Sequence, residues 1–507
     1  MEVNKIEHIS HFATDHSITL FWDQLDDFKP ATYYHVFVNG EYVGKSSKTH
    51  YTVTNLKPSA QYGIVIEACC DGNTLARGDY GIVETMGKKH IIDITQPPYC
   101  AVGDGKHMNT EVIQRAIDAC GIDDVLFIPK GIFMTGALRL HSNMEMFLDD
   151  GAVLQGTDQV KDYLPKIPSR FEGTELLCYS SLLNMGELDR AGGYNCRNVF
   201  IHGKGTIASG GSELAWNVIN LERENMKAYL EELGDAIKEC ENEATIPGRV
   251  RPRLINMSNC QNVVLSGLTL KNGASWNVHM IYSDNIVTHD CKFYSENVHN
   301  GDGWDPDSST NCTIFGCEFF TGDDSVAIKS GKNPEGNIIN RPCTNIRIFD
   351  CVSRYGHGVT IGSEMSGGVE NVKIWDCDLK NSVYGIEIKG TKKRGGYVRN
   401  IQVSDCVLPR VLFHSVGYND DGVSAGTAPI FEKCTFQRVQ ISGAYLSKEK
   451  EWCPCTAIEL SGFEEMNREL REIEFSEIQL GMEGMLQEQM ISLRLCRNIT
   501  FRNLNCI

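Results

Sequence analysis

The chain has 507 residues, a formal net charge of −18 at pH 7 and a pI near 5.3. This acidic balance argues against nucleic acid and anionic membranes as partners, because both are bound through basic surfaces. No run of about 18 apolar residues occurs, and the first residues lack a basic region followed by an apolar one, so we expect neither a membrane span nor a signal peptide. The 20 cysteines are then expected to be reduced, buried thiols of a cytoplasmic protein.

Residues 1–87 predict a small β-sandwich. Short alternating strands run through 17–25, 33–43 and 62–72, and Asn39-Gly40 is a typical hairpin turn. Trp22, and Tyr62 with the turn segment before it, resemble a fibronectin type III domain, in which Tyr62 would be the tyrosine-corner residue. We expect such a module to support its neighbour, with glycan binding as the alternative.

A second domain is expected over residues 95–507. After the linker 87–96, residues 109–117 predict an amphipathic helix capped by Asn109. Short strands with glycine punctuation follow at 125–131 and 136–140. This beginning resembles that of the right-handed parallel β-helix enzymes that degrade pectin.

A repeat follows in the second half of the chain. Five asparagines each precede a cysteine by six residues, with alternating apolar positions between them: Asn285 and Cys291, Asn311 and Cys317, Asn345 and Cys351, Asn371 and Cys377, and Asn400 and Cys406. An asparagine at a bend followed by a strand of period two is typical of one turn of a β-solenoid. The cysteines are 26 to 34 residues apart, which favours stacking over zinc binding.

Residues 209–248 interrupt the repeat with a charged stretch of helical character. Insertions in a solenoid emerge as loops on one face. We therefore expect either a plain surface insertion or a wall that closes one end of a binding groove.

Polar residues of complementary chemistry recur at about one solenoid turn. Asp302 precedes Asp323 by 21 residues, His357 follows Asp324 by 33, and Lys389 follows His357 by 32. If the turns stack about 4.8 Å apart, three carboxylates meet an imidazole and an ammonium on one face. Cleavage of a glycosidic bond needs one carboxylic acid and one carboxylate, so the pattern predicts an acid/base site for glycoside hydrolysis.

Asp323 and Asp324 are neighbours, so a bend at Gly322 is needed to turn both toward one groove. Like charges this close are expected to raise one pKa and to keep one acid protonated at neutral pH.

The segments around Asp302, Asp323-Asp324, His357 and Lys389 resemble the four signatures of the polygalacturonase family, glycoside hydrolase family 28. The resemblance spans about residues 95–507. It implies an inverting reaction in which Asp323 is the general acid, while Asp302 and Asp324 hold and activate the water. His357 would maintain the protonation of Asp323 and Lys389 would bind the sugar, with no metal or dissolved cofactor.

Two positions depart from the family pattern. Gly301 replaces a threonine, and Glu387 stands two residues before Lys389 where the family has an arginine. An anion there repels a uronate instead of binding it. Three alternatives stay open: Glu387 points away and Arg394 substitutes, Glu387 forms a local ion pair with Lys389 or Lys392, or the sugar at this subsite is neutral or cationic.

Further substrate contacts are expected from residues close to the acids. Trp276 and His279 fall one turn before Asp302 and are candidates for a stacking wall, and Asn300 belongs to the Asp302 motif. His299 is left out of the catalytic set.

The leading hypothesis is a hydrolase that removes α-linked galacturonate or a related sugar from pectin-derived oligosaccharides by exo action. A polysaccharide lyase is one alternative, with Asp302, Asp305 and Asp307 as calcium ligands. A glycan-binding solenoid without catalysis is another. The paired Asp323-Asp324 and His357 favour hydrolysis.

Overall fold

The computed structural model describes residues 4–26, 28–29, 32–234, 237, 240, 244–417, 422–447, 449, 451–484 and 489–507. The chain separates into two compact units, Met1–His90 and Ile91–Ile507. The first is made of β-strands alone within its described residues, and the second is a parallel β-helix.

The N-terminal unit contains a five-stranded and a three-stranded sheet within the described residues. In order across the sheets these are β1 (Asn4–Lys5), β8 (Asn73–Glu84), β7 (Gln61–Cys70), β4 (Tyr33–Val38) and β5 (Glu41–Ser46), then β2 (Ser10–Ala13), β3 (Ile18–Phe21) and β6 (His50–Val53). Trp22 packs edge-on against Tyr34 in the core, with 5.1 Å between ring centroids. The hydroxyl of Tyr62 accepts a hydrogen bond from the backbone N–H of Lys57, five residues upstream.

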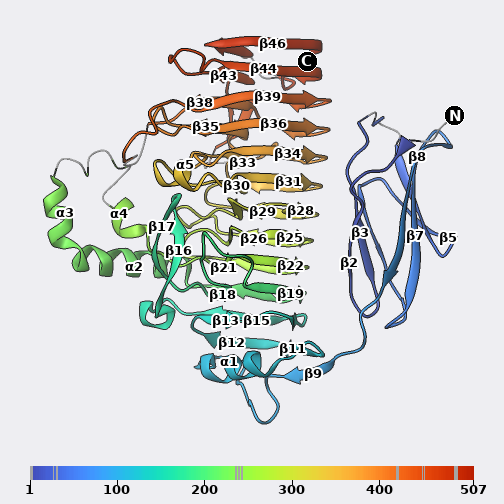
Figure 1. Ribbon diagram of the computed structural model, residues 1–507, viewed down its shortest axis with the longest axis vertical. Helices are drawn as coiled ribbons and strands as arrows, with labels where there is room; N and C mark the ends of the chain where they lie inside the picture. The colour runs from blue at the N-terminus through green and yellow to red at the C-terminus, as the bar shows by residue number, and fades with distance from the viewer. Residues whose placement is uncertain are drawn as a thin grey trace. The chain divides into compact units, whose positions relative to one another are not determined.

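Three long parallel sheets form the second unit, and its strands stack in chain order from β9 to β46 (Figure 1). The sheet of eight strands is β10 (Asp104–Met108), β12 (Gly131–Thr135), β15 (Ala152–Gly156), β20 (Thr206–Ala208), β23 (Thr269–Lys271), β26 (Lys292–Tyr294), β29 (Glu318–Phe320) and β32 (Val352–Tyr355), counted over the described residues. The sheet of eleven is β13 (Leu138–Leu140), β18 (Leu183–Met185), β21 (Ile255–Ser258), β24 (Val278–Ile281), β27 (Trp304–Asp307), β30 (Val326–Ile328), β33 (Gly358–Ile361), β35 (Gly385–Gly390), β38 (Val411–Ser415), β43 (Ile458–Ser461) and β45 (Ile491–Arg494), on the same basis.

The third sheet has fifteen strands in the described part of the chain. They are β9 (His90–Asp93), β11 (Asp124–Ile128), β14 (Met144–Leu148), β19 (Cys196–Gly203), β22 (Cys260–Ser266), β25 (Asp284–His289), β28 (Thr313–Phe315), β31 (Cys343–Phe349), β34 (Val369–Trp375), β36 (Tyr397–Ser404), β37 (Val407–Leu408), β39 (Ile430–Gln437), β40 (Gln440–Ile441), β44 (Leu470–Leu480) and β46 (Cys496–Cys506). Two antiparallel hairpins stand outside the sheets: β16 (Lys166–Phe171) with β17 (Thr174–Tyr179), and β41 (Ala444–Leu446) with β42 (Trp452–Pro454).

The repeated asparagines and cysteines explain how the turns stack. All five predicted asparagines have φ between +52° and +57°, a left-handed conformation that asparagine tolerates better than most residues. Their amides form a ladder, for example from Asn285 Nδ2 to Asn262 Oδ1 at 2.8 Å. The five cysteines are buried free thiols, and the backbone N–H of Cys291 donates to the sulfur of Cys317 on the next turn. The predicted parallel β-helix is therefore confirmed.

Helices are few among the described residues: α1 (Thr110–Ala119), the 3₁₀ helix η1 (Val160–Tyr163), α2 (Gly211–Asn225), α3 (Lys227–Leu233), α4 (Thr245–Gly248) and α5 (Glu335–Ile339). Three of them, α2, α3 and α4, lie in the predicted insertion, where residues 235–236, 238–239 and 241–243 are outside the described part. Asn109 precedes α1 as predicted, but the predicted side-chain cap is wrong. Its amide instead exchanges hydrogen bonds with the backbone of Val102 and so ties down the preceding loop.

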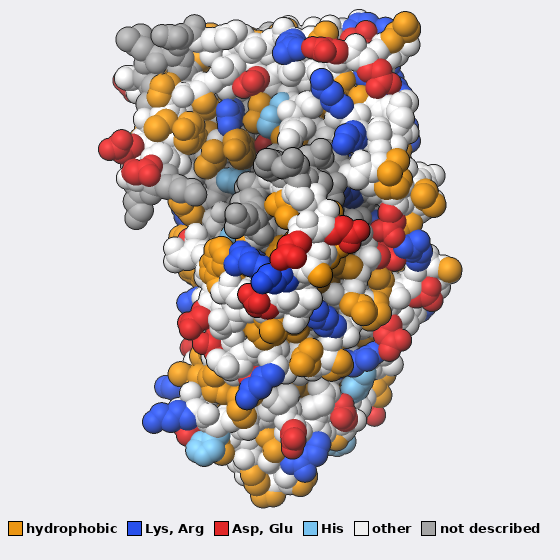
Figure 2. Space-filling model, turned by 90° about the vertical axis from the view of Figure 1, so that its left-hand side faces the viewer, with side chains coloured by type: hydrophobic (Ala, Val, Ile, Leu, Met, Phe, Trp, Pro, Cys, Tyr) orange, Lys and Arg blue, Asp and Glu red, His pale blue; other side chains and the backbone are white. Residues whose placement is uncertain are grey.

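The described helices include none with the length and apolar character needed to cross a bilayer. Acidic and basic side chains are interspersed over the face of the molecule shown in Figure 2.

Candidate active site

A cavity of about 300 Å³ opens on the outward face of the eleven-stranded sheet. Parallel pairing places Thr360 of β33 beside Glu387 of β35, and Lys389 of β35 beside His414 of β38. Strand residues alternate between faces, so Glu387 and Lys389 point outward while Ile386 and Ile388 fill the core. The β-helix thereby brings polar residues from several turns to one wall.

The three predicted acids line this cavity together with His357. Asp302 lies just before β27, and Asp323 and Asp324 lie in the bend just before β30. This bend directs both neighbouring carboxylates into the cavity, as the sequence requires for a shared site.

His357 holds a short contact to the acid pair. Its Nδ1 lies 2.7 Å from Asp323 Oδ1 and 3.4 Å from Asp324 Oδ1. Burial lowers the pKa of His357, but the charge of Asp323 and its hydrogen bond outweigh this and raise the pKa well above 6.5. Burial also raises the pKa of Asp323, yet His357 and, to a smaller extent, Lys389 and Lys329 hold it below its usual value.

The expectation that crowding raises one pKa within the Asp323-Asp324 pair is not met at Asp323, because His357 lowers the pKa of that carboxyl group. His357 supplies a compensating cation, and the Asp323–His357 pair holds one proton as a unit. The raised carboxyl pKa belongs to Asp302, where burial is the largest cause and the charge of Asp305 the next, with Lys329 opposing them.

Asp302 is buried beside a lysine that the sequence argument did not single out. Lys329 Nζ lies 3.5 Å from Asp302 Oδ2 and 3.7 Å from Glu364 Oε2, and all three residues line the cavity. The charges of Glu364, Asp302 and Asp305 outweigh the effect of burial and raise the pKa of Lys329 well above its usual value. This lysine therefore stays charged, and its charge opposes without reversing the rise in the pKa of Asp302.

Glu387 lies in the cavity wall in a local ion pair. Its Oε2 is 2.9 Å from Lys389 Nζ, and its Oε1 is 2.7 Å from His414 Nε2. The hydroxyl of Thr360 lies 3.4 Å from Oε2 and 2.7 Å from Asp324 Oδ1, to which it donates. Burial raises the pKa of Glu387, but Lys389 and His414 outweigh it and lower the pKa to about 2. Of the three alternatives for this residue, the one in which Glu387 points away is wrong, because period-two alternation puts it on the same face as Lys389.

Arg394 does not take the place of the missing arginine. It is buried and does not line the cavity, and its guanidinium donates to Asn333 Oδ1 at 2.7 Å and to Ser363 Oγ at 3.4 Å. Of these residues, Ser363 lines the cavity, so Arg394 supports the wall from behind.

Trp276 and Asn300 line the cavity, whereas His279 does not. The Trp276 ring is 3% exposed and stacks on Phe171 with 4.7 Å between centroids. Asn300 Nδ2 donates to Asp323 Oδ2 at 3.4 Å, while its Oδ1 accepts a bond of 2.7 Å from Arg251. Asn300 thus orients the predicted acid.

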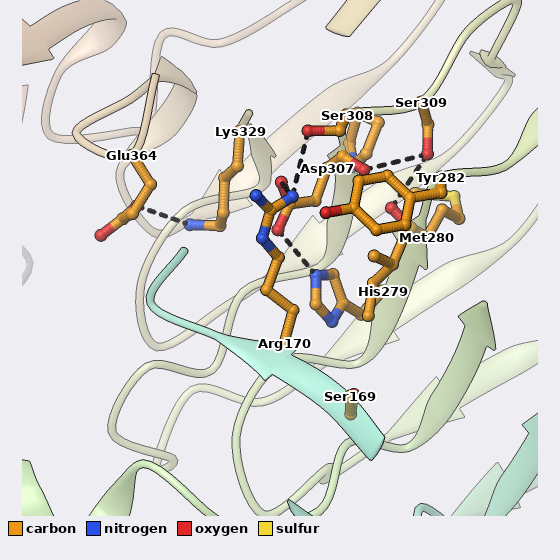
Figure 3. A network of polar contacts seen from close by, with 12 residues as sticks. Ser169, Arg170, His279, Met280, Tyr282, Asp307, Ser308, Ser309, Lys329 and Glu364 are labelled. Atoms are coloured by element: carbon orange, nitrogen blue, oxygen red, sulfur yellow. Dashed lines mark hydrogen bonds and ion pairs between the residues drawn. The ribbon is translucent and has the colours of Figure 1, made fainter. Parts of the chain in front are cut away.

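His279 belongs to a buried network behind the cavity (Figure 3). Its Nε2 lies 3.4 Å from Asp307 Oδ2, and burial lowers its pKa to about 4 despite that contact. Arg170, which extends from the β16–β17 hairpin, donates to Asp307 Oδ1 at 2.9 Å and to Ser308 Oγ at 3.0 Å. Arg170 and His279 already contact the two oxygens of the Asp307 carboxylate. Asp307 is therefore not free to act as a ligand in the calcium cluster considered for a lyase.

The turn of the same hairpin brings Glu172 to the cavity. The backbone N–H of Lys332 donates to the carbonyl of Gly173, and Arg249 Nε donates to Glu172 Oε2 at 2.9 Å. Sequence reasoning missed Glu172, Lys329, Glu364, Tyr384 and His414. Of these, Lys329 has a signal in the sequence. It belongs to the same segment as Asp323-Asp324, and its position two residues after Ala327 places the two side chains on the same face of the strand.

The carboxylates and imidazole of Asp323, Asp324 and His357 have ligand atoms within 4.8 Å of one another, close enough to contact one metal ion. The same short contacts, of 2.7 and 3.4 Å between the imidazole and the two carboxylates, also fit proton transfer.

Comparisons with known proteins show which family the chain resembles. The family "Glycosyl hydrolases family 28" matches residues 166–421, half of the chain. An exo-poly-alpha-D-galacturonosidase of Dickeya chrysanthemi is 25% identical over 97% of this chain and 89% of its own length, and a probable polygalacturonase of Vitis vinifera is 32% identical over 66% of this chain and 64% of its own.

Two solved structures show the same fold. The family 28 exopolygalacturonase of Yersinia enterocolitica superposes with a TM-score of 0.83 and 21% identity, covering 99% of this chain and 96% of that one. The exopolygalacturonase of Thermotoga maritima gives 0.66 and 26%, covering 82% and 91%. The chain belongs to glycosyl hydrolases family 28.

Proposed function

We propose that this protein is an inverting hydrolase that removes α-linked galacturonate, or a related sugar, from the end of pectin-derived oligosaccharides. The observation that carries the proposal is the meeting of Asp302, Asp323, Asp324 and His357 around one cavity. Acid/base cleavage of a glycosidic bond needs this combination of a proton donor and a carboxylate that activates water.

In the proposed reaction the proton held by the Asp323–His357 pair passes through Asp323 to the glycosidic oxygen. The bond between the anomeric carbon and that oxygen breaks, and a water oxygen bonds to the anomeric carbon from the opposite face. Asp324 takes the proton that the water loses, while Asp302 helps to hold the water. Lys329, beside Asp302, opposes the effects of burial and of Asp305 that raise the pKa of that carboxyl group.

Three observations support exo action. The volume of about 300 Å³ is at the small end for ligand cavities. Glu172 from the β16–β17 turn and Glu364 both contribute to its wall, and the relatives of similar length carry exo names.

The test is hydrolysis of defined oligogalacturonides and partly methyl-esterified oligomers, followed by chromatography and by NMR of the first anomer released. We expect one short product from the start, with inverted configuration. Asp323→Asn is expected to lower kcat by about 10³-fold, within the usual range for a lost general acid. Asp123 is exposed, so Asp123→Asn makes the same chemical change and serves as the matched control. A random ladder of products rules out exo action, and an unaffected Asp323→Asn rules out the site.

We also propose that the N-terminal unit is fibronectin type III-like and has a supporting role. Its two sheets share one core, and Tyr62 bonds to the upstream backbone as a tyrosine corner does. Tyr42→Ala removes an exposed aromatic ring from β5 and checks the alternative of glycan binding. We expect unchanged affinity for polygalacturonate, and a clear loss contradicts the supporting role.

A further inference from the structure

The subsite beside the acids has an unusual charge balance. Six carboxyl groups line the cavity, from Glu172, Asp302, Asp323, Asp324, Glu364 and Glu387, against two lysines and three histidines within the described residues, and the pKa of one of these histidines, His357, is raised. Both lysines already lie within 4 Å of a carboxylate of the same wall: Lys329 beside Asp302 and Glu364, and Lys389 beside Glu387. A substrate carboxylate entering here adds a further negative charge to a wall whose ammonium groups are already paired.

The Glu387 carboxylate is held in place from two sides. Lys389 comes from the same strand and His414 from β38, and each lies within 3 Å of one of its oxygens. The hydroxyl of Thr360 in β33 lies 3.4 Å from the carboxylate, but its shorter bond, of 2.7 Å, goes to Asp324. A uronate could reach Lys389 or His414 only by lying against Glu387, and like charges at such distances repel strongly in a buried site. An ammonium on the sugar would in turn meet Lys389.

We propose that the subsite formed by Glu387, Lys389 and His414 binds an uncharged pyranose, whose hydroxyls donate hydrogen bonds to Glu387. The inference rests on the proposed hydrolase function and names the sugar that this part of the site accepts. Two sources share this chemistry: a methyl-esterified uronate, and a neutral sugar within a mixed chain. A carboxylate remains a good acceptor for hydroxyl groups while it discriminates against anions, which is how one residue can select substrates by charge.

The test compares four substrates with wild-type enzyme: methyl-esterified trigalacturonate, its saponified form, an α-linked oligomer that alternates galacturonate with a neutral deoxyhexose, and an α-linked oligogalactosamine. We expect kcat/KM for the methyl-esterified trimer, for the mixed oligomer with the neutral deoxyhexose, or for both to exceed kcat/KM for the saponified trimer at least 10-fold. Preference for the ester identifies an esterified uronate as the source, and preference for the mixed oligomer identifies a neutral sugar. A preference for the saponified or aminated substrate overturns the inference.

Glu387→Arg is expected to raise kcat/KM for the saponified trimer at least 10-fold and to lower it for the preferred uncharged substrate. Glu387→Gln keeps the shape of the side chain, so it serves if the arginine variant does not fold, and it should reduce the discrimination between the two charge classes. Glu472→Arg makes the same charge change at an exposed position of β44 and is expected to alter neither value. Unchanged discrimination in both Glu387 variants overturns the inference.

Binding separates this inference from the proposed reaction. Calorimetry with Asp323→Asn measures the affinity for each of the four substrates without turnover. We expect the esterified trimer or the mixed oligomer to bind with the highest affinity. Equal or tighter binding of the saponified trimer overturns the inference even if hydrolysis is established. Absence of hydrolysis of all four by wild-type enzyme rejects the proposed function, whereas the order of affinities still decides the charge of the sugar.

Discussion

At the scale of single residues, the behaviour of the acids is decided by which cation lies beside each. Asp323 and Asp324 are neighbours in the chain, yet His357 contacts Asp323 at 2.7 Å and Asp324 at 3.4 Å. The shorter contact, with its charge, lowers the pKa of Asp323 and raises that of His357. The cation that lies beside Asp302 is Lys329. The proton needed for catalysis is therefore held by a pair and not by a carboxyl group alone.

His357→Gln tests this arrangement. Loss of the imidazolium leaves burial as the main influence on the pKa of Asp323, so Asp323 alone must keep the proton. Because His357 keeps its proton until the pH rises through its raised pKa, the wild-type enzyme should remain active well above pH 6.5. In the variant we expect the basic limb of kcat/KM to move to lower pH and kcat to fall by about 10²-fold or more. A pH profile with the wild-type basic limb contradicts the shared proton.

At the scale of elements, the β16–β17 hairpin positions part of the cavity through one buried ion pair. Arg170 and Asp307 are both fully buried and lie 2.9 Å apart, although 137 residues separate them in the chain. The strands themselves were predictable, because asparagine bends and alternating apolar residues mark each turn. The hairpin was not, since its contacts to Asp307 depend on side chains that meet only in the folded protein.

Arg170→Met is expected to destabilise the fold by about 3–5 kcal/mol, because it leaves Asp307 buried without its counter-charge. Asp307→Asn in the same chain should recover part of this loss, so the double variant is expected to be more stable than the sum of the two single changes predicts. Denaturant unfolding gives the three values. Arg494→Met, which removes an exposed ion pair to Glu464, is the control and should change stability little. Similar losses at Arg170 and Arg494 contradict the role given to the hairpin.

At the scale of the whole molecule, the net charge of −18 acts on any charged substrate. Acidic and basic side chains of the described residues are interspersed over the face of Figure 2. A polyanionic chain is therefore repelled at long range, and an uncharged oligomer is not.

Salt provides the corresponding measurement. Raising the ionic strength from about 0.01 M to about 0.15 M shortens the Debye length from about 30 Å to about 8 Å. We expect KM for long polygalacturonate to fall over this range, while KM for a fully methyl-esterified trimer stays constant. A KM for polygalacturonate that rises with salt indicates instead an attractive basic surface on the protein.

The sequence by itself indicated the β-helix and the residues proposed for catalysis. Asn285 and its four counterparts mark bends, because asparagine tolerates the left-handed conformation that each bend requires. The spacing of Asp302, Asp323, His357 and Lys389 places them on successive turns, because a parallel solenoid repeats its contacts at each turn.

Only the tertiary structure decided how these residues are paired. The bond from His414 to Glu387 depends on the register between β35 and β38. Arg394 and His279 lie outside the cavity because both side chains are buried in the packing behind its wall. The protonation of the acids and of His357 could not be predicted from the sequence either, since burial and neighbouring charges at distances of 3–4 Å set each pKa. Periodicity along the chain tells which face a residue occupies, whereas its partner across strands follows from the register and from the insertions between turns.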